Sequence, residues 1–182
     1  MFKRTHNCGD IRSSDINNTI TLNGWVNKVR LHGQVVFVDL RDRYGKTQIV
    51  FDADEYEGDF EIIKKISMED VLSIKGTVRL RLESAINPNL ATGEIEILVS
   101  EFIMLNESAP LPFMLNDRAN AEEDLRLKYR YLELRMEELQ QNLLIRHSTY
   151  QATRSYLSEN KFVEVETPVL MKSTPEGARD YL

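Results

Sequence analysis

The sequence predicts a small, closed β-barrel followed by a helical region. From Thr19 to Leu105, apolar residues recur at every second position in most segments, which is the period of half-buried strands. The segment Tyr56–Ile66 instead has apolar residues three apart, which indicates a short helix. Three strands, a helix and two further strands is the element order of an OB barrel, a fold whose sheet face and connecting loops bind oligonucleotides.

The first three strands are expected at Thr19–Arg30, Gln34–Leu40 and Lys46–Phe51. Gly24 interrupts the first of them, which suggests a bend or a bulge at that point. Asp42–Gly45 separates the second strand from the third and is typical of a hairpin turn, with glycine where a positive φ is needed.

The last two strands are expected at Val71–Leu82, with Gly76 in the middle, and at Glu94–Leu105, after a polar loop. A barrel of this size is filled by its own side chains. The inward apolar residues are therefore expected to form a core and not a ligand cavity. They are Leu22, Val36, Val38, Ile49, Val78 and Ile95.

Ala109–Pro112 marks a boundary in the chain, because two prolines interrupt regular structure there. Beyond it the apolar spacing is helical, with one helix starting near Asn120 and a longer one over 136–159. Phe162–Leu170 then alternates like a strand until Pro168. The expected division is 1–108 for the barrel, 109–135 for a hinge and 136–182 for the start of another domain.

The composition is that of a globular protein, with 182 residues, 42% hydrophobic and 29% charged. The single cysteine, Cys8, excludes an intramolecular disulfide and a multi-cysteine zinc site, so a reducing compartment is expected. No apolar run is long enough to span a bilayer, and the start of the chain lacks the apolar stretch of a signal peptide. We therefore expect a cytoplasmic protein without a membrane partner.

The formal net charge of −6 argues weakly against binding to nucleic acid, because phosphate contacts need basic side chains. The charge is uneven, however, and a local basic face leaves RNA binding open. The basic residues that gather on the first strands are Lys28, Arg30, Arg41, Arg43 and Lys46.

Phe37 is the residue of most interest on the predicted barrel. It is central on the second strand, with Arg30 and Gln48 on the neighbouring strands. An aromatic ring beside guanidinium and amide groups matches what an unpaired RNA base requires, which is stacking together with hydrogen bonds to its edge. On the residues alone, burial of Phe37 in the core is the better interpretation.

Three segments carry a resemblance to a known family. Residues 91–96 read ATGEIE, residues 125–135 read LRLKYRYLELR and residues 174–182 read TPEGARDYL. In order and spacing they resemble bacterial aspartyl-tRNA synthetases, which are class II enzymes, and the similarity runs from Gly9 to Leu182. The related lysyl and asparaginyl enzymes share the barrel and the hinge, whereas the closing PEGARDYL is specific to the aspartate enzymes.

The resemblance implies roles for individual residues. Phe37 matches the phenylalanine that stacks on an anticodon base, and Gln48 and Glu96 match residues that contact base edges; as plain strand residues, these two would lie on solvated faces.

Helix 136–159, the strand after it and Pro168 resemble motif 1, which forms the homodimer interface, although they also fit an ordinary helix–strand unit. Glu176 matches a glutamate near the α-ammonium group of the substrate aspartate, in a loop that closes over the amino-acid pocket. Further anticodon contacts are implied for Arg30, Arg79 and Asn87.

The implied activity is the ATP-dependent ligation of L-aspartate to tRNA-Asp by a homodimeric full-length enzyme with an α+β class II catalytic domain. ATP and Mg²⁺ would bind beyond Leu182, in motifs 2 and 3, so no catalytic residue and no metal site is expected within the 182 residues, which should be inactive alone. His32 stands where members strict for one tRNA often carry leucine, so we hypothesise that tRNA-Asn is also charged; simple loop variation is an equal alternative. Two other functions stay open: a non-catalytic OB-fold RNA-binding module, and a related asparaginyl or lysyl synthetase.

Overall fold

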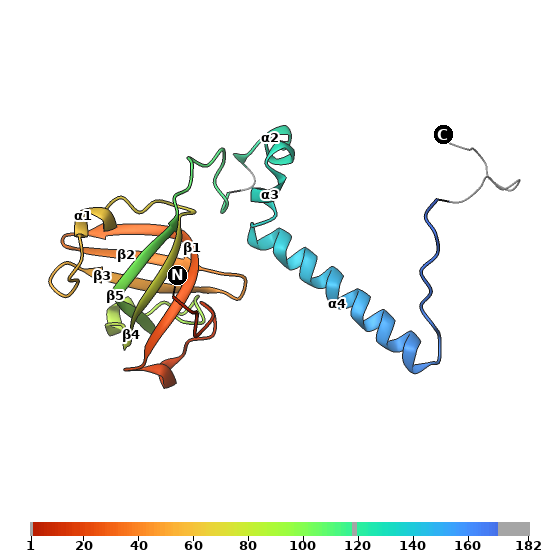
Figure 1. The fold of residues 1–182 in the computed structure, drawn as a ribbon, viewed down its shortest axis with the longest axis horizontal. Helices are drawn as coiled ribbons and strands as arrows, with labels where there is room; N and C mark the ends of the chain where they lie inside the picture. Colours follow the sequence, from red (N-terminus) through yellow and green to blue (C-terminus); the bar gives the residue numbers. More distant parts are fainter. Residues whose placement is uncertain (1, 118–119, 171–182) are drawn as a thin grey trace, which may run out of the picture. The chain divides into compact units, whose positions relative to one another are not determined.

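The computed structural model describes residues 2–117 and 120–170 of the chain. The chain divides into two compact units, residues 1–111 and 112–182. Figure 1 shows their elements, which in chain order are the 3-10 turn η1 (Ser13–Asp15), β1 (Thr19–His32), β2 (Val35–Arg41), β3 (Lys46–Asp52), α1 (Phe60–Ile63), β4 (Val71–Leu80), the 3-10 turn η2 (Glu83–Ala85), β5 (Ile95–Asn106), α2 (Glu123–Lys128), α3 (Arg130–Glu133) and α4 (Glu137–Glu159).

The first unit is a barrel closed in the strand order β1–β2–β3–β5–β4. β1 is long enough to pair with β4 through its first half and with β2 through its second half. β3 and β5 run parallel, with Ile49 beside Ile97, and this pairing closes the ring. The predicted OB-type order is therefore confirmed, and each predicted strand end lies within two residues of the observed one.

The predicted helix Tyr56–Ile66 is shorter in the structure, where only α1 is helical. Asp59 caps it by accepting a hydrogen bond from the Glu61 amide at 2.9 Å. Tyr56 lies outside the helix because its ring packs edge-on against Phe51, with the centroids 5.8 Å apart. Packing on the barrel thus takes precedence over the helical spacing at this end.

The core of the barrel lies inside the ring of strands. All six residues that the sequence predicts as interior are buried, together with Phe51 and residues from the start of the chain. Gly76 lies where β4 and β5 shift register, and a Cβ atom there would stand 2.3 Å from the carbonyl oxygen of Leu98. At Gly24 a Cβ atom would stand 2.5 Å from the Arg41 carbonyl oxygen, although the register shift of β1 lies slightly later, between Val26 and Lys28.

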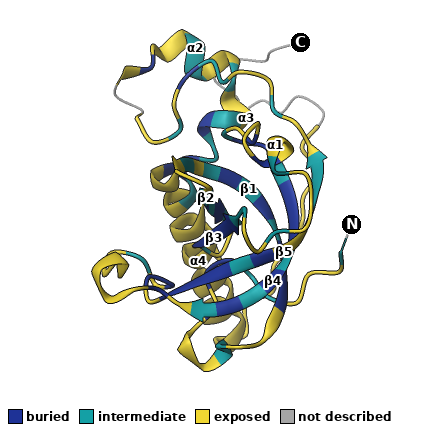
Figure 2. Ribbon diagram, turned by 90° about the vertical axis from the view of Figure 1, so that its left-hand side faces the viewer, coloured by how far each residue is buried: buried dark blue, intermediate teal, exposed yellow. Residues whose placement is uncertain are grey.

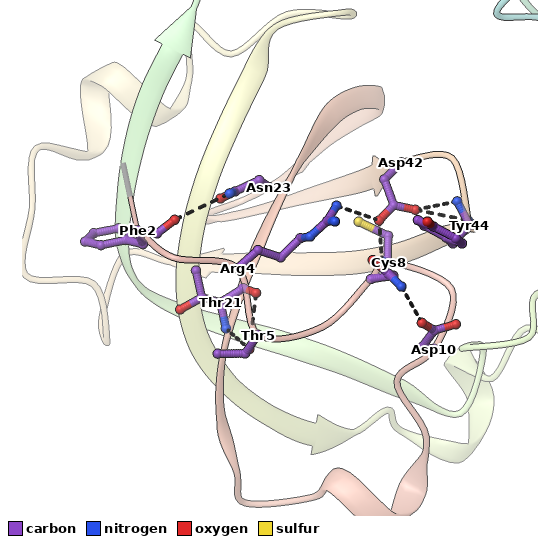
Figure 3. A network of polar contacts seen from close by, with 11 residues as sticks. Phe2, Arg4, Thr5, Cys8, Asp10, Thr21, Asn23, Asp42 and Tyr44 are labelled. Carbon is purple, nitrogen blue, oxygen red and sulfur yellow. Dashed lines mark hydrogen bonds and ion pairs between the residues drawn. The ribbon is translucent and has the colours of Figure 1, made fainter.

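The N-terminal segment is attached to the barrel wall (Figure 3). Thr5 and Thr21 exchange hydrogen bonds, the Thr5 amide to the Thr21 carbonyl at 3.0 Å and the Thr21 amide to the Thr5 hydroxyl at 2.9 Å. Asp42 accepts from the amides of Cys8 (2.9 Å) and Tyr44 (2.7 Å), and so joins this segment to the β2–β3 turn. The Cys8 side chain is completely buried, and burial, with Asp42 beside it, raises the pKa of its thiol.

In the second unit, the predicted first helix is divided into α2 and α3, because the backbone leaves the helical region at Tyr129. Tyr129 and its neighbours still pack in one small cluster around Phe113, Ala121 and Met136. Glu133 is completely buried beside this cluster. Its carboxylate accepts a hydrogen bond from Arg126 at 2.6 Å and also pairs with Arg130.

α4 confirms the longer predicted helix, and its yellow colour in Figure 2 shows how little of it is buried. Within α4 only Leu139 is buried. After Asn160 the chain turns back, and Arg154 on the helix binds both carboxylate oxygens of Glu164, at 3.1 and 3.0 Å. The strand predicted in Phe162–Leu170 is wrong: the segment is irregular and exposed, because no strand in the described part of the chain lies alongside to pair with it.

Candidate nucleic-acid interface

The alternation of β2 decides the position of Phe37. Val36, Val38 and Leu40 point into the core, so Phe37 and Asp39 lie on the outer face. Phe37 is half-buried there, beside Arg30 of β1 in the register of the two strands. The core position that the residues alone favour for Phe37 is therefore wrong, and its ring is available on the surface.

Phe37 forms part of the wall of an open pocket of about 430 Å³. The pocket collects residues from the end of β1, from β2 and β3, and from the connection between β4 and β5. Four of the six predicted anticodon-contacting residues meet here, together with His32, although they are far apart in the sequence. The full lining is Arg30, Leu31, His32, Phe37, Gln48, Arg81, Ala85 and Asn87.

A chain of hydrogen bonds runs along one side of the pocket. Arg30 donates to both oxygens of Asp39, at 3.1 and 2.7 Å, and to the Gln48 side-chain oxygen at 3.0 Å. The Gln48 amide nitrogen donates to Glu96 at 2.8 Å, and the other Glu96 oxygen accepts from Arg79 at 2.9 Å. Gln48 and Glu96 are buried, 7% and 8% exposed, so their interpretation as solvated strand residues is wrong.

These hydrogen bonds fix the orientation of the Gln48 side chain. Its oxygen accepts from Arg30 while its nitrogen donates to Glu96, so the amide cannot rotate without breaking both bonds. Glu96 and Arg79 do not line the pocket themselves and act on it through Gln48. A pocket with fixed donor and acceptor positions is suited to reading the edge of a planar base.

Arg81 lines the pocket as well, and sequence reasoning did not select it as a site residue. Its spacing of two from Arg79 is the available signal, because residues two apart on a strand share a face. The basic cluster is less concentrated than the sequence indicates. Of its five members only Arg30 lines the pocket, and Arg41 forms a largely buried ion pair with Glu69.

The remaining predicted residues lie elsewhere. Pro168 is exposed in the irregular segment after α4, and Glu176 lies outside the described residues. Within residues 2–117 and 120–170, no group of three His, Cys, Asp or Glu side chains is placed to hold a metal ion. The same ranges contain no helix that is both long enough and apolar enough to cross a bilayer.

Two known families match different parts of the chain. Residues 20–105 match the OB-fold nucleic acid binding domain, and residues 122–182 match the class II tRNA synthetases for D, K and N. An aspartate–tRNA(Asp/Asn) ligase from Salinibacter ruber is 50% identical over 183 residues, which is 98% of this chain and 29% of the relative. A ligase of the same name from Geotalea uraniireducens is 50% identical over 100% of this chain and 30% of its own length. The chain thus spans about 30% of the length of the curated relatives that it matches.

Solved structures support the fold. Asparaginyl-tRNA synthetase from Pyrococcus horikoshii, in complex with asparaginyl-adenylate, aligns with a TM-score of 0.83 at 22% identity over 98% of this chain and 39% of that one. The aspartyl-tRNA synthetase of Entamoeba histolytica aligns with a TM-score of 0.80 at 22% identity, over 96% of this chain and 41% of that one.

Proposed function

Because the chain belongs to the class II aspartyl-tRNA synthetase family, we propose that its barrel binds the anticodon of tRNA-Asp. The observation that carries the proposal is Phe37, a half-buried ring on the outer face of the barrel at the wall of an open, polar pocket. In this proposal one anticodon base leaves the stack of its neighbours and lies on Phe37. Stacking of this kind contributes about 1–3 kcal/mol per base to RNA binding.

The polar side chains around Phe37 read the edge of the base. Arg30 and Asn87 are far apart in the sequence but line the same pocket, where the side chain of each carries hydrogen-bond donors. Gln48 presents an amide whose orientation Arg30 and Glu96 hold fixed. Arg79 contributes by holding Glu96, so it supports recognition from outside the pocket.

The test is a titration of the 182-residue chain with the anticodon stem-loop of tRNA-Asp, at several stated salt concentrations. We expect a stem-loop changed at the middle anticodon base to bind more weakly, since a base-specific contact is lost. Phe37→Ala should weaken the cognate complex by about 1–3 kcal/mol. The matched aromatic control is Tyr44→Ala, because Tyr44 is exposed on the β2–β3 turn and does not line the pocket.

Equal affinity for the cognate and the changed stem-loop would remove base recognition from the proposal, leaving only contacts to phosphate. Equal losses for Phe37→Ala and Tyr44→Ala would move the stacking site away from the pocket.

We further propose that the full-length protein is an aspartate–tRNA ligase. The aspartate carboxylate attacks the α-phosphate of ATP and releases pyrophosphate, and the tRNA terminal ribose hydroxyl then displaces AMP from the aspartyl-adenylate. In this proposal ATP and Mg²⁺ bind in sequence beyond Leu182, and Glu176 contacts the substrate ammonium group. Aspartate-dependent exchange of pyrophosphate into ATP should occur with the full-length protein and not with the 182-residue chain; exchange by the chain alone would contradict this assignment.

We propose that the full-length protein also charges tRNA-Asn. The relatives named above are aspartate–tRNA(Asp/Asn) ligases, and His32 lines the pocket at the end of β1, where it can bear on anticodon choice. Aminoacylation assays with the two purified tRNAs should both give aspartyl product. No product on tRNA-Asn would restrict the protein to tRNA-Asp and leave His32 as loop variation.

We also propose that the full-length protein is a homodimer that uses α4 and the segment around Pro168. α4 leaves Leu143, Tyr150 and Leu157 exposed, and their spacing of seven residues places them on one face that is suited to burial against a second copy. Light scattering should give twice the monomer mass for the full-length protein. Replacement of Leu143 by Glu should shift the mass toward the monomer, whereas a monomeric unsubstituted protein would exclude the dimer.

A further inference from the structure

The guanidinium group of Arg81 is buried at the wall of the pocket. Arg81 directly follows β4, and its side chain lines the pocket although the residue is only 8% exposed. Its Nε donates to the carbonyl oxygen of Ile95 at 2.8 Å, which holds one side of the group. Its Nη2 is buried and has no hydrogen-bond partner. Buried polar groups are almost always bonded, so an exception requires an explanation.

The neighbouring arginines differ from Arg81 in how their charge is balanced. Arg30 is bonded to Asp39 and Arg79 to Glu96, so each has a carboxylate as its direct partner. The Arg81 side chain instead donates to a neutral backbone carbonyl. Burial lowers the pKa of Arg81, while the charges of Glu96 and Asp39, already bonded to the other two arginines, act in the opposite direction.

Among the side chains that line the pocket, Arg81 is the one with a buried donor atom that has no hydrogen-bond partner. Gln48 is held at both ends, and Arg30 divides its donors between Asp39 and Gln48. A base stacked on Phe37 would present its edge to the same pocket that Arg81 lines. Carbonyl oxygens and ring nitrogens are the acceptors on such an edge.

We propose that Arg81 is a specificity-determining residue of the barrel, whose Nη2 donates to a carbonyl or ring-nitrogen acceptor on the RNA base that stacks on Phe37. The proposal rests on the proposed anticodon binding and names the base chemistry that the pocket selects. The bond forms by a small turn of the guanidinium group about its anchor on Ile95. A base edge fits better than a phosphate, because Arg81 is buried at the wall of the pocket and held there by its bond to Ile95, beside the place where a base stacked on Phe37 would lie.

The experiment compares Arg81→Gln with Arg43→Gln in the complete chain. Arg43 is an exposed arginine on the β2–β3 turn, so its replacement removes the same charge without touching the pocket. Both variants and the unsubstituted chain are titrated with the cognate anticodon stem-loop and with stem-loops changed at each anticodon base in turn. The titrations are repeated over a range of salt concentrations, and the denaturation midpoint of each variant is measured.

We expect Arg81→Gln to weaken cognate binding by about tenfold, the size of one good base contact. The penalty for changing the base should shrink at one anticodon position only, because the group that discriminates there is gone. The salt dependence should stay close to that of the unsubstituted chain, and the denaturation midpoint should not fall, since a buried and incompletely bonded charge has been removed. Arg43→Gln should leave the discrimination unchanged.

Several results would overturn the inference. A uniform loss over all stem-loops with a reduced salt slope would make Arg81 a phosphate contact. Unchanged binding with a lower denaturation midpoint would make it a purely structural residue. Arg81→Lys serves if Arg81→Gln does not fold, and is expected to keep the charge but lose discrimination. If Phe37→Ala and the base changes have no effect on the unsubstituted chain, the proposed anticodon binding fails; if they act and Arg81→Gln does not, only this inference fails.

Discussion

The barrel and α4 are both regular structures, but different interactions stabilise them. Every strand of the barrel is hydrogen-bonded on both sides in a closed ring and encloses a core of buried apolar residues. α4 is the longest element of the chain, with 23 residues, and within it only Leu139 is buried. The barrel is therefore stabilised by packing between distant segments, whereas α4 depends on bonds within its own backbone.

The difference shows where a functional surface can be built. A binding pocket needs side chains held in position, and packing beneath the sheet supplies this for Phe37 and Gln48. α4 presents apolar side chains without neighbours to fix them, which suits a surface completed by another part of a protein. Substitutions in the two regions should separate these two kinds of structure.

The largest effect is expected from Phe51→Ala. Phe51 is fully buried in the barrel, and its ring packs edge-on against Phe102 with the centroids 5.6 Å apart. Its truncation should lower the free energy of unfolding of the barrel by about 3–5 kcal/mol. The control is Leu143→Ala in α4, which should change it by less than about 0.5 kcal/mol. Similar losses for both in denaturant titrations would contradict the contrast.

Glu133→Gln should have the next largest effect on stability, and this effect should be confined to the second unit. The buried carboxylate neutralises Arg126, so removal of its charge leaves a cation in a poorly solvated position. We expect local destabilisation by about 2–3 kcal/mol, below the usual cost of breaking a buried pair because Arg130 remains solvated. Hydrogen exchange should accelerate in α2 and α3 and stay unchanged in the barrel; exchange that accelerates equally in both would show that the units unfold together.

Glu96→Ala tests whether the polar side of the pocket also stabilises the barrel. It leaves the Gln48 amide without its acceptor and Arg79 with only its longer contact to Glu55 at 3.6 Å, which should cost about 1–2 kcal/mol of unfolding free energy. Glu96→Gln keeps an acceptor for Gln48 and should lose less. Thermal denaturation of the two variants provides the comparison, and equal stability would show that solvent replaces these bonds without cost.

The smallest effect is expected from Glu164→Gln. Glu164 pairs with Arg154 on the surface of α4, where both side chains are exposed and screened by solvent. The helical circular dichroism signal and its thermal transition should not change measurably. A clear loss of helix would show that this pair, rather than the backbone, maintains α4.

Much of the barrel could be predicted because its strands alternate strictly. The pattern from Val36 to Leu40 places alternate residues in the core, and the same pattern puts Phe37 outside. The helix 136–159 was likewise predictable from its spacing, as was its end at Asn160. The resemblance to a family then selected the residues that the fold brings together in the pocket.

What could not be predicted depends on contacts between distant segments. Burial of Gln48 and Glu96 follows from their meeting across β3 and β5, a pairing that neither local sequence contains. Arg81 was missed because its incomplete bonding is visible only once the pocket exists. The prediction of a strand after α4 was wrong because alternation of apolar residues does not form a strand unless another strand pairs with it.

Burial of Cys8 has a practical consequence. The chain has a single cysteine, and in the folded barrel its thiol is inaccessible and held protonated. A thiol reagent should therefore modify only molecules whose barrel has opened, and the labelling rate under native conditions counts those openings without denaturant. Local unfolding of α4 should not change the labelling rate of Cys8. The rate therefore reports opening of the first unit and not of the second.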